Sequence, residues 1–274
     1  MIATGQIPTF SAKPFDVIAG QYDACFTNSK IGRTQRQSVW QELDRLFQPG
    51  QRVLDINCGT GEDALHLAAR GIRVVSFDAS AEMIAVARRK LEASAHQNYV
   101  DFRVLAIEEM SRLETAELYD GVLSNFAGLN CVADLRFVVH DLARLVKPGG
   151  RVILCLFGRF CLWEILWYAL HGNLKKAFRR FHGKGVIASL APGNTVLVGY
   201  PSVRSLQQDF AAHFRLVGWK GTGVLVPPSY LEQWAVRFPR LFAFAAWIDP
   251  ILGRSRGFRY LADHVVVVLE KMVA

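Results

Sequence analysis

The chain alternates between short runs of consecutive apolar residues and longer stretches in which apolar residues recur every three or four positions. Short apolar runs that end in turn residues predict buried strands, and the wider spacing predicts helices with one apolar face. Strands are expected at residues 52–56, 72–77, 100–106, 121–124 and 151–157, with helices between them at 63–70, 81–94 and 133–146. This alternation predicts an α/β fold built on a doubly wound, mostly parallel sheet.

After Phe157 the alternation becomes irregular. Further elements are expected as a helix at 160–181, a hairpin of 186–190 and 195–200, a helix at 202–213, a strand at 214–226, helices within 229–262 and a strand at 264–271. Residues 15–47 also have helical spacing, around a loop at 27–32. We therefore expect seven strands in a single domain over residues 1–274. Its helical and hairpin insertions would form an N-terminal helical lid (1–48), an inserted cap (158–201) and a C-terminal helical cap (227–262).

The composition fits a folded protein, because 51% of the residues are hydrophobic and 20% are charged. A formal net charge of +8 permits contact with nucleic acid, an anionic membrane or an acidic substrate and does not choose among them. The five cysteines lack paired spacing, which indicates reduced thiols in a cytoplasmic protein, and no metal site is expected from them or from the histidines. Residues 1–15 lack the features of a signal peptide.

The first chemical signal is the stretch RVLDINCGTGEDA at residues 52–64. An apolar strand stops there in a glycine turn, and a helical pattern follows. Gly59, Gly61 and Ala64 have the spacing in which the first glycine makes a tight turn, the second admits a ligand close to the backbone, and the third position packs helix on strand. The stretch therefore predicts a nucleotide or nucleoside site, with a purely structural turn as the alternative.

Two acidic residues refine this prediction. Asp78 ends the second apolar run, where a nucleoside-binding sheet places the carboxylate that accepts the two ribose hydroxyls. Asp55 ends the first run, where it would repel the pyrophosphate of a dinucleotide. A nucleoside that carries an ammonium and a sulfonium group fits such a site better.

At these residues the chain resembles the class I S-adenosylmethionine-dependent methyltransferases. Residues 53–61 are similar to motif I of that family, Asp78 matches its ribose-binding acid, and the resemblance extends over residues 22–157. It implies that S-adenosylmethionine is the cofactor and that a small molecule accepts the methyl group by in-line displacement. Placing the acceptor atom in line behind the methyl group can supply much of the barrier reduction, on the order of 7 kcal/mol or more, without an acid or base.

The resemblance also implies roles for individual residues. Tyr22 matches an aromatic lid residue, Arg33 and Arg36 are placed to grip the cofactor carboxylate, and Asn125 and Phe126 follow the fourth strand where the family lines the methionine end. Ala106 stands where the family has an acid for the adenine amino group, so Glu108 or the backbone of Ile107 takes that contact. The expected cofactor-binding residues are Tyr22, Arg33, Asp55, Cys58, Gly59, Gly61, Asp78, Ala79, Met83, Ile107, Glu108, Asn125 and Phe126.

Two strongly apolar stretches, 160–181 and 227–261, lie where the family inserts substrate-covering elements. Charged residues interrupt both, so neither is expected to span a bilayer. We expect them to cover a mainly apolar acceptor, with two alternatives: peripheral contact with anionic lipid headgroups, or packing across a homodimer. Tyr168, His171 and Tyr230 are the candidate bases.

Three other functions share parts of the pattern. A nicotinamide-dependent oxidoreductase shares the glycines and Asp78, a non-catalytic protein would bind S-adenosylmethionine alone, and a nucleic-acid methyltransferase shares the fold. Residues 124–130 lack the Asn-Pro-Pro-Tyr type of sequence found in enzymes that methylate amino groups of bases. No nucleic-acid partner is therefore expected.

Overall fold

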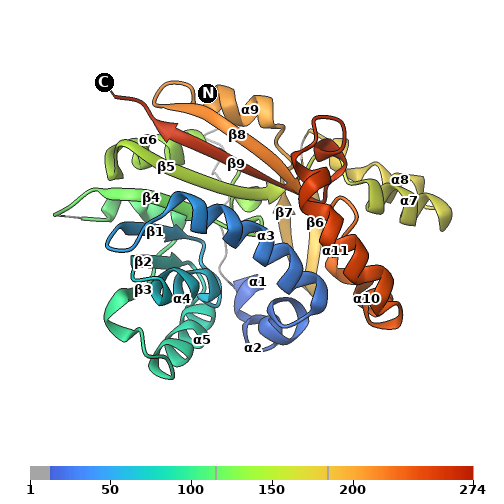
Figure 1. The fold of residues 1–274 in the computed structure, drawn as a ribbon, viewed down its shortest axis with the longest axis horizontal. Coiled ribbons are helices and arrows are strands. Elements are labelled where there is room, and N and C mark those ends of the chain that lie inside the picture. Colours follow the sequence, from blue (N-terminus) through green and yellow to red (C-terminus); the bar gives the residue numbers. More distant parts are fainter. Residues whose placement is uncertain (1–12, 115, 184, 274) are drawn as a thin grey trace, which may run out of the picture.

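A seven-stranded sheet forms the centre of the molecule in the computed structural model, which describes residues 13–114, 116–183 and 185–273 (Figure 1). The strand order is β3-β2-β1-β4-β5-β9-β8, and a hairpin of β6 and β7 stands apart. The strands are β1 (Arg52–Ile56), β2 (Arg73–Asp78), β3 (Val100–Val104), β4 (Tyr119–Ser124), β5 (Val146–Phe157), β6 (Val186–Ala191), β7 (Asn194–Val198), β8 (Phe214–Thr222) and β9 (His264–Lys271).

The first five strands of the sheet are parallel, and β9 runs antiparallel to both β5 and β8. Strand order reverses between β1 and β4, as in other doubly wound sheets. The prediction of a doubly wound, mostly parallel seven-stranded sheet is confirmed.

Helices cover both faces of the sheet. The α-helices are α1 (Lys13–Asp16), α2 (Ala19–Tyr22), α3 (Lys30–Leu46), α4 (Glu62–Ala69), α5 (Ala81–Glu92), α6 (Arg136–Leu145), α7 (Leu162–Leu170), α8 (Leu174–Ala177), α9 (Val203–Phe210), α10 (Glu232–Arg237) and α11 (Pro239–Arg254). Successive strand residues point to opposite faces, so Val53 packs with α3, α4 and α5, whereas its neighbour Leu54 packs with α6 and α9. Short turns are the π-helix η1 (Asp23–Thr27) and the 3₁₀ helices η2 (Gln97–Tyr99), η3 (Ile107–Arg112), η4 (Gly128–Cys131), η5 (Arg179–Phe181), η6 (Ser229–Leu231) and η7 (Arg259–Leu261).

Several elements are shorter than their patterns predicted. The helix expected at 160–181 is divided into α7, α8 and η5, because Gly172 adopts φ +71° and the Asn173 side chain caps α8. Pro239 starts α11 at the break from α10, since proline fits the first helical turn. Strand β8 ends at Thr222, before Gly223 at φ +79°.

The N-terminal elements, the hairpin and the C-terminal helices gather at one edge of the sheet. Helix α1 packs against α5, β6 and β7, while α10 packs against α3. In Figure 1, α7, α8, α10 and α11 lie at the end of the molecule away from β3. Residues 1–12, part of the expected lid, lie outside the described residues. Among the described helices, none has both the length and the apolar character that crossing a bilayer requires.

Candidate functional site

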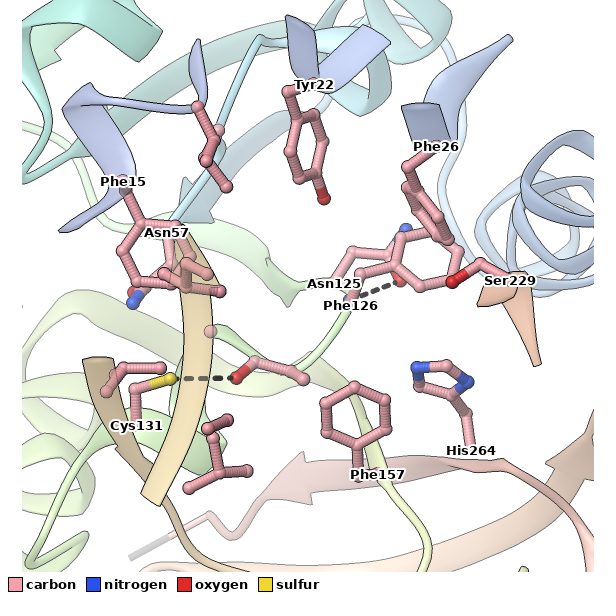
Figure 2. A pocket seen from close by; sticks show the side chains of 18 of the residues that line it. Phe15, Tyr22, Phe26, Asn57, Asn125, Phe126, Cys131, Phe157, Ser229 and His264 are labelled. Atoms are coloured by element: carbon pink, nitrogen blue, oxygen red, sulfur yellow. Dashed lines mark hydrogen bonds between the residues drawn. The ribbon is translucent and has the colours of Figure 1, made fainter. Parts of the chain in front are cut away.

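A cavity of ≈ 570 Å³ opens where the parallel strands end. The residues that follow β1, β2 and β4 line it, and β1 and β4 are the neighbours between which strand order reverses. This is the place where doubly wound sheets bind ligands, and the volume is that of a small-molecule site. Figure 2 shows Tyr22 and Phe26 on one side of the cavity and Phe157 and His264 on the other.

The glycine turn after β1 has two distinct parts. Gly59 has φ +53° and nothing within 4 Å of the position a Cβ would take, so its backbone is open to the cavity. Gly61 has φ +76°, and a Cβ there would lie 2.4 Å from the Phe102 ring. Gly61 therefore lets the turn pack against β3 and α5, and it does not line the cavity.

Asp78 is held rigidly at the cavity wall. Its two carboxylate oxygens accept the backbone N–H groups of Gly59 and Ser80, each at 2.9 Å. Burial raises the pKa of Asp78, although these two hydrogen bonds oppose the shift. The arrangement fixes a carboxyl group beside the open glycine, as a ribose diol requires.

A buried arginine faces the cavity from α3. Arg36 Nη1 donates to Asp63 Oδ2 at 2.6 Å, and Asp63 also accepts from Trp40 Nε1 at 2.7 Å and Asn125 Nδ2 at 3.0 Å. The Arg36 guanidinium lies 4.8 Å from the centre of the Phe126 ring. Arg36 Nε is buried and has no hydrogen-bond partner among the described residues. An unpaired buried donor is costly, so this atom fits an anionic group of a ligand.

The loop after β4 is conformationally constrained. Phe126 and Ala127 both have positive φ, +47° and +67°, which non-glycine residues rarely adopt. Asn125 Oδ1 accepts the Phe126 N–H at 2.9 Å, which helps to hold this backbone. Such strain is typical of functional sites, and here it turns Phe126 toward the cavity (Figure 2).

The opposite wall is largely apolar. Phe157 at the end of β5 and the side chains of Leu190, Val196 and Val198 from the hairpin line it, with Tyr200 beside them. Apart from Phe157, these residues come from the part of the chain that follows the regular α/β alternation.

Four charged side chains form a network at this wall, of which Glu164, Arg180 and Asp263 are buried and Arg179 is half-buried. Glu164 accepts from Arg179 and Arg180, and Arg180 Nη2 also donates to Asp263 Oδ1 at 2.7 Å. Arg180 Nη1 donates to the carbonyls of Gly158 and Asp263. Two carboxylates thus balance two guanidinium groups, and the network presents no net charge to the cavity.

His264 is the only described histidine that lines the cavity. Its ring lies 4.7 Å from the Phe157 ring and 5.5 Å from the Phe126 ring, centre to centre. His264 Nδ1 lies 3.2 Å from Asp263 Oδ2, without the geometry of a hydrogen bond. Burial opposes ionisation of Asp263, but His264 and Arg180 outweigh it and hold the pKa of Asp263 well below its usual range. Since Nδ1 is turned toward Asp263, Nε2 lies on the side of the ring away from that carboxylate.

The structure brings most of the residues expected from the sequence to this cavity and leaves others outside it. Those that line the cavity are Tyr22, Arg36, Cys58, Gly59, Asp78, Ala79, Met83, Ile107, Asn125, Phe126 and Tyr230. Those that do not line it are Arg33, Asp55, Gly61, Glu108, Tyr168 and His171.

The expected residues that do not line the cavity are exposed to solvent or make other contacts. Arg33 and Glu108 are exposed. His171 Nδ1 bonds to the carbonyl of Trp167, and the Tyr168 ring lies 6.2 Å from the Tyr230 ring. Burial, followed by the charge of Glu164, raises the pKa of Tyr230 far above its usual range, so its phenolate is disfavoured as a base.

For the charge argument to hold, Asp55 would have to face the ligand, but its side chain does not line the cavity. Its side chain is 1% exposed, Ser76 Oγ donates to it at 3.4 Å, and burial followed by the charge of Asp63 raises its pKa well above the usual range. The carboxyl groups that do line the cavity are those of Glu62, Asp63, Asp78, Glu164 and Asp263. The argument from Asp55 against a dinucleotide therefore does not hold.

His264, Asp263, Arg180 and Asp63 were not expected at the site. One signal was available for His264: an antiparallel strand starts at the edge where its parallel neighbours end, and His264 is the first residue of β9. The network of Glu164 with Arg180 carried no such signal, since its members show no motif spacing and Asp263 lies 83 residues from Arg180.

The fold and this cavity define a doubly wound α/β protein of the Rossmann-like methyltransferase type. Residues 53–150 match the family model described as "Methyltransferase domain". The chain belongs to the class I S-adenosylmethionine-dependent methyltransferases, and its methyl donor is S-adenosylmethionine. The predicted family, enzyme class and cofactor are confirmed.

Three curated relatives illustrate the range of the family. The chain is 28% identical over 217 residues to the ubiquinone/menaquinone biosynthesis C-methyltransferase UbiE of Geotalea daltonii, covering 76% of this chain and 87% of the relative. It is 30% identical to the demethylmenaquinone methyltransferase of Symbiobacterium thermophilum, covering 61% and 70%. It is 34% identical to the tRNA 5-carboxymethoxyuridine methyltransferase of Escherichia coli, covering 58% of each chain.

A solved structure supports the fold. The CcbJ methyltransferase of Streptomyces caelestis aligns with a TM-score of 0.61 over 96% of this chain and 100% of its own, at 15% sequence identity. At this identity the likeness concerns the fold alone.

Proposed function

We propose that the enzyme transfers the methyl group of S-adenosylmethionine to an apolar aromatic hydroxyl compound of the quinol type. The observation that carries this proposal is the wall formed by Phe157 and the β6–β7 hairpin, apolar and next to an ion network without net charge. A neutral, apolar ring fits such a wall, whereas a charged metabolite would lose its hydration there without a counter-ion. Two of the relatives named above are quinone-pathway methyltransferases, which supports the same class of acceptor.

The other half of the cavity fits the cofactor. Asp78 would take the ribose hydroxyls beside the open backbone of Gly59. Arg36 would bind the carboxylate through its unpaired Nε, and the buried, unpaired Oδ1 of Asn57 would accept the ammonium group. Met83 and Ile107 would flank the adenine. When bound, the cofactor supplies an electrophilic methyl group on a sulfonium.

The N-terminal elements and the insertions would close this site. We assign the lid to the described part of residues 1–48, and the caps to 158–201 and 227–262. Thr60 Oγ1 and Lys90 Nζ donate to Asp23 at 2.7 and 2.9 Å, which ties the lid to the cofactor half of the cavity. Helix α1 reaches the hairpin, so lid and cap meet over the cavity. Closure of this kind excludes water from the reacting groups.

His264 is our candidate for the general base. Its Nε2 would take the hydroxyl proton of the acceptor, while the O–H electron pair stays on oxygen. The oxygen, or a ring carbon conjugated with it, would form the bond to the methyl carbon, and the electron pair of the broken C–S bond would pass to sulfur. Where a ring carbon is methylated, that carbon would lose its hydrogen as a proton to solvent, and the oxygen would take its own proton back from His264. Asp263 beside Nδ1 would stabilise the imidazolium that forms.

The acceptor class is tested by offering two acceptors together. Purified enzyme with methyl-labelled S-adenosylmethionine is incubated with demethylmenaquinol in detergent and with bulk transfer RNA, and the label is counted in the organic phase and in the RNA. Label in demethylmenaquinol supports the proposal. Label confined to the RNA overturns it and favours the nucleic-acid alternative, which the tRNA methyltransferase relative keeps relevant.

The role of His264 is tested with His264→Asn, using total cellular lipid as the acceptor source. The turnover rate should fall about 10²- to 10⁴-fold, as expected for loss of general base catalysis, while calorimetric binding of S-adenosylmethionine stays near that of the parent. Added imidazole should restore part of the rate. His140→Asn, at an exposed histidine of α6, is the matched control. A parental rate in His264→Asn would remove His264 from the mechanism.

A further inference from the structure

Helix α11 has two apolar sides. Its buried residues Phe242, Ala245, Asp249 and Gly253 follow helical spacing and pack inward. Leu241, Phe244, Trp247 and Ile251 follow the same spacing but are 54%, 54%, 69% and 61% exposed. At 3.6 residues per turn, the two sets lie on opposite sides of the helix. A helix that is apolar on both sides requires a second apolar environment on its outer side.

Helix α7 and the segment after it continue this surface. Leu170 is 83% exposed, and Leu174, Phe178 and Trp167 are exposed as well. The two parts are connected: the Trp163 ring lies 5.7 Å from the Trp234 ring, and Trp163 Nε1 donates to the Leu225 carbonyl. We call the exposed apolar side chains of α7, α8, α10 and α11 the outer apolar surface.

The charges around the outer apolar surface are of one sign. Among the described residues of 162–183 and 229–260, the exposed ionic side chains are those of Lys175, Lys176, Arg237, Arg240, Arg254 and Arg256. The three carboxylates in these ranges are not fully exposed: Glu164 and Asp249 are buried, and Glu232 accepts the backbone N–H groups at the start of α3. The surface is therefore both apolar and cationic.

We propose that the outer apolar surface docks the enzyme on an anionic phospholipid bilayer. Apolar side chains bounded by lysine and arginine insert at the boundary between headgroups and acyl chains, where anionic lipids attract the cations. A second copy of this chain fits less well, because pairing the surface with itself would bring cationic side chains together without counter-charges.

The docking surface borders the candidate site. Tyr230 is 45% exposed and also lines the cavity, and Glu164 of α7 and Arg179 line the same wall. An acceptor dissolved in the bilayer would thus meet the apolar half of the cavity without crossing water. The docking proposal itself requires no particular acceptor, and its failure would leave the methyl transfer proposal standing.

Flotation of the full-length protein with lipid vesicles tests the proposal. The parent should float with vesicles of phosphatidylcholine and phosphatidylglycerol, much less with phosphatidylcholine alone, and less at high salt. Leu170→Gln with Trp247→Gln should abolish flotation. Lys175→Gln with Lys176→Gln should weaken binding to the anionic vesicles about 30-fold, at roughly one kilocalorie per mole for each cation.

Tyr99→Gln is the matched control, since Tyr99 is an exposed aromatic residue just before β3, away from the outer apolar surface. It should float like the parent, and all variants should bind S-adenosylmethionine normally in calorimetry. A parent that stays with the aqueous phase, or a Leu170→Gln, Trp247→Gln variant that floats unchanged, would overturn the proposal. The proposal would also be overturned if the parent bound no vesicles and analytical sedimentation showed a dimer that Trp247→Gln dissociates.

Discussion

Two buried polar atoms are the clearest sign of a ligand site in the part of the cavity that we assign to the cofactor. Arg36 Nε, a donor, and Asn57 Oδ1, an acceptor, are buried without a hydrogen-bond partner among the described residues, and as a pair they would match a carboxylate and an ammonium group. Asp78, by contrast, is anchored by two backbone donors, so its position is fixed before any ligand binds. Preorganised groups of this kind bind a ligand without the cost of ordering them.

Asp78→Ala should lower the affinity for S-adenosylmethionine by at least 100-fold. Two hydrogen bonds to a charged acceptor would be lost, each worth about 1.5–3 kcal/mol, and the anchors of Gly59 and Ser80 would be lost with them. Calorimetry measures the affinity, and circular dichroism checks the fold. Asp101→Ala removes an exposed acid of β3 and should bind normally. An affinity within a few fold of the parent would exclude Asp78 from the site.

Gly59→Ala and Gly61→Ala should separate the two parts of the glycine turn. Both have positive φ, so each substitution costs about 1 kcal/mol of strain. Gly61→Ala also forces a methyl group against Phe102 and should lower the melting temperature much more than Gly59→Ala. Gly59→Ala places its methyl group in the cavity and should weaken cofactor binding more than stability. Equal effects of both variants on both readouts would contradict this division.

At the scale of elements, periodicity predicted the sheet and its covering helices well, because alternation and helical spacing directly reflect burial on this scaffold. Strand β9 matches the predicted 264–271. The breaks were harder to predict: η1 is a π-helix over Asp23–Thr27, where the pattern suggested a helix and then a loop. The buried Glu164–Arg180–Asp263 network could not be predicted, because it joins α7, η5 and the start of β9 through tertiary contacts alone.

That network predicts how stability depends on pH. The folded pKa of Asp263 is lowered, so its ionisation stabilises the fold above the unfolded pKa of about 3.9, and this stability is lost as pH falls through the folded pKa. Asp263→Asn should lower the free energy of unfolding by about 3 kcal/mol near neutral pH, because Arg180 loses one of its two buried carboxylate partners and keeps only Glu164. The difference should shrink in acid. Urea unfolding across pH measures it, with the exposed Asp101→Asn as control; a constant difference would contradict the account.

At the scale of the whole molecule, the cavity combines residues from two parts of the chain, the ends of the parallel strands and the segments inserted around them. The parallel strands contribute Gly59, Asp78 and Asn125, whose positions follow from the fold and could be predicted from the sequence. The side that we propose for the acceptor is built from N-terminal residues, the hairpin and the start of β9, which only the folded chain brings together. His264 illustrates the difference, since its role depends on neighbours from β4, β5 and the residue before it.

The central claim is that this enzyme methylates an apolar acceptor. The most direct measurement incubates the purified protein with methyl-labelled S-adenosylmethionine and a complete cell extract, separates lipid from aqueous and macromolecular fractions, and locates the label by mass spectrometry. We predict a single labelled compound in the lipid fraction that carries an aromatic hydroxyl group or its methyl ether, absent with Asp78→Ala. Label confined to a water-soluble metabolite or to RNA would contradict the account.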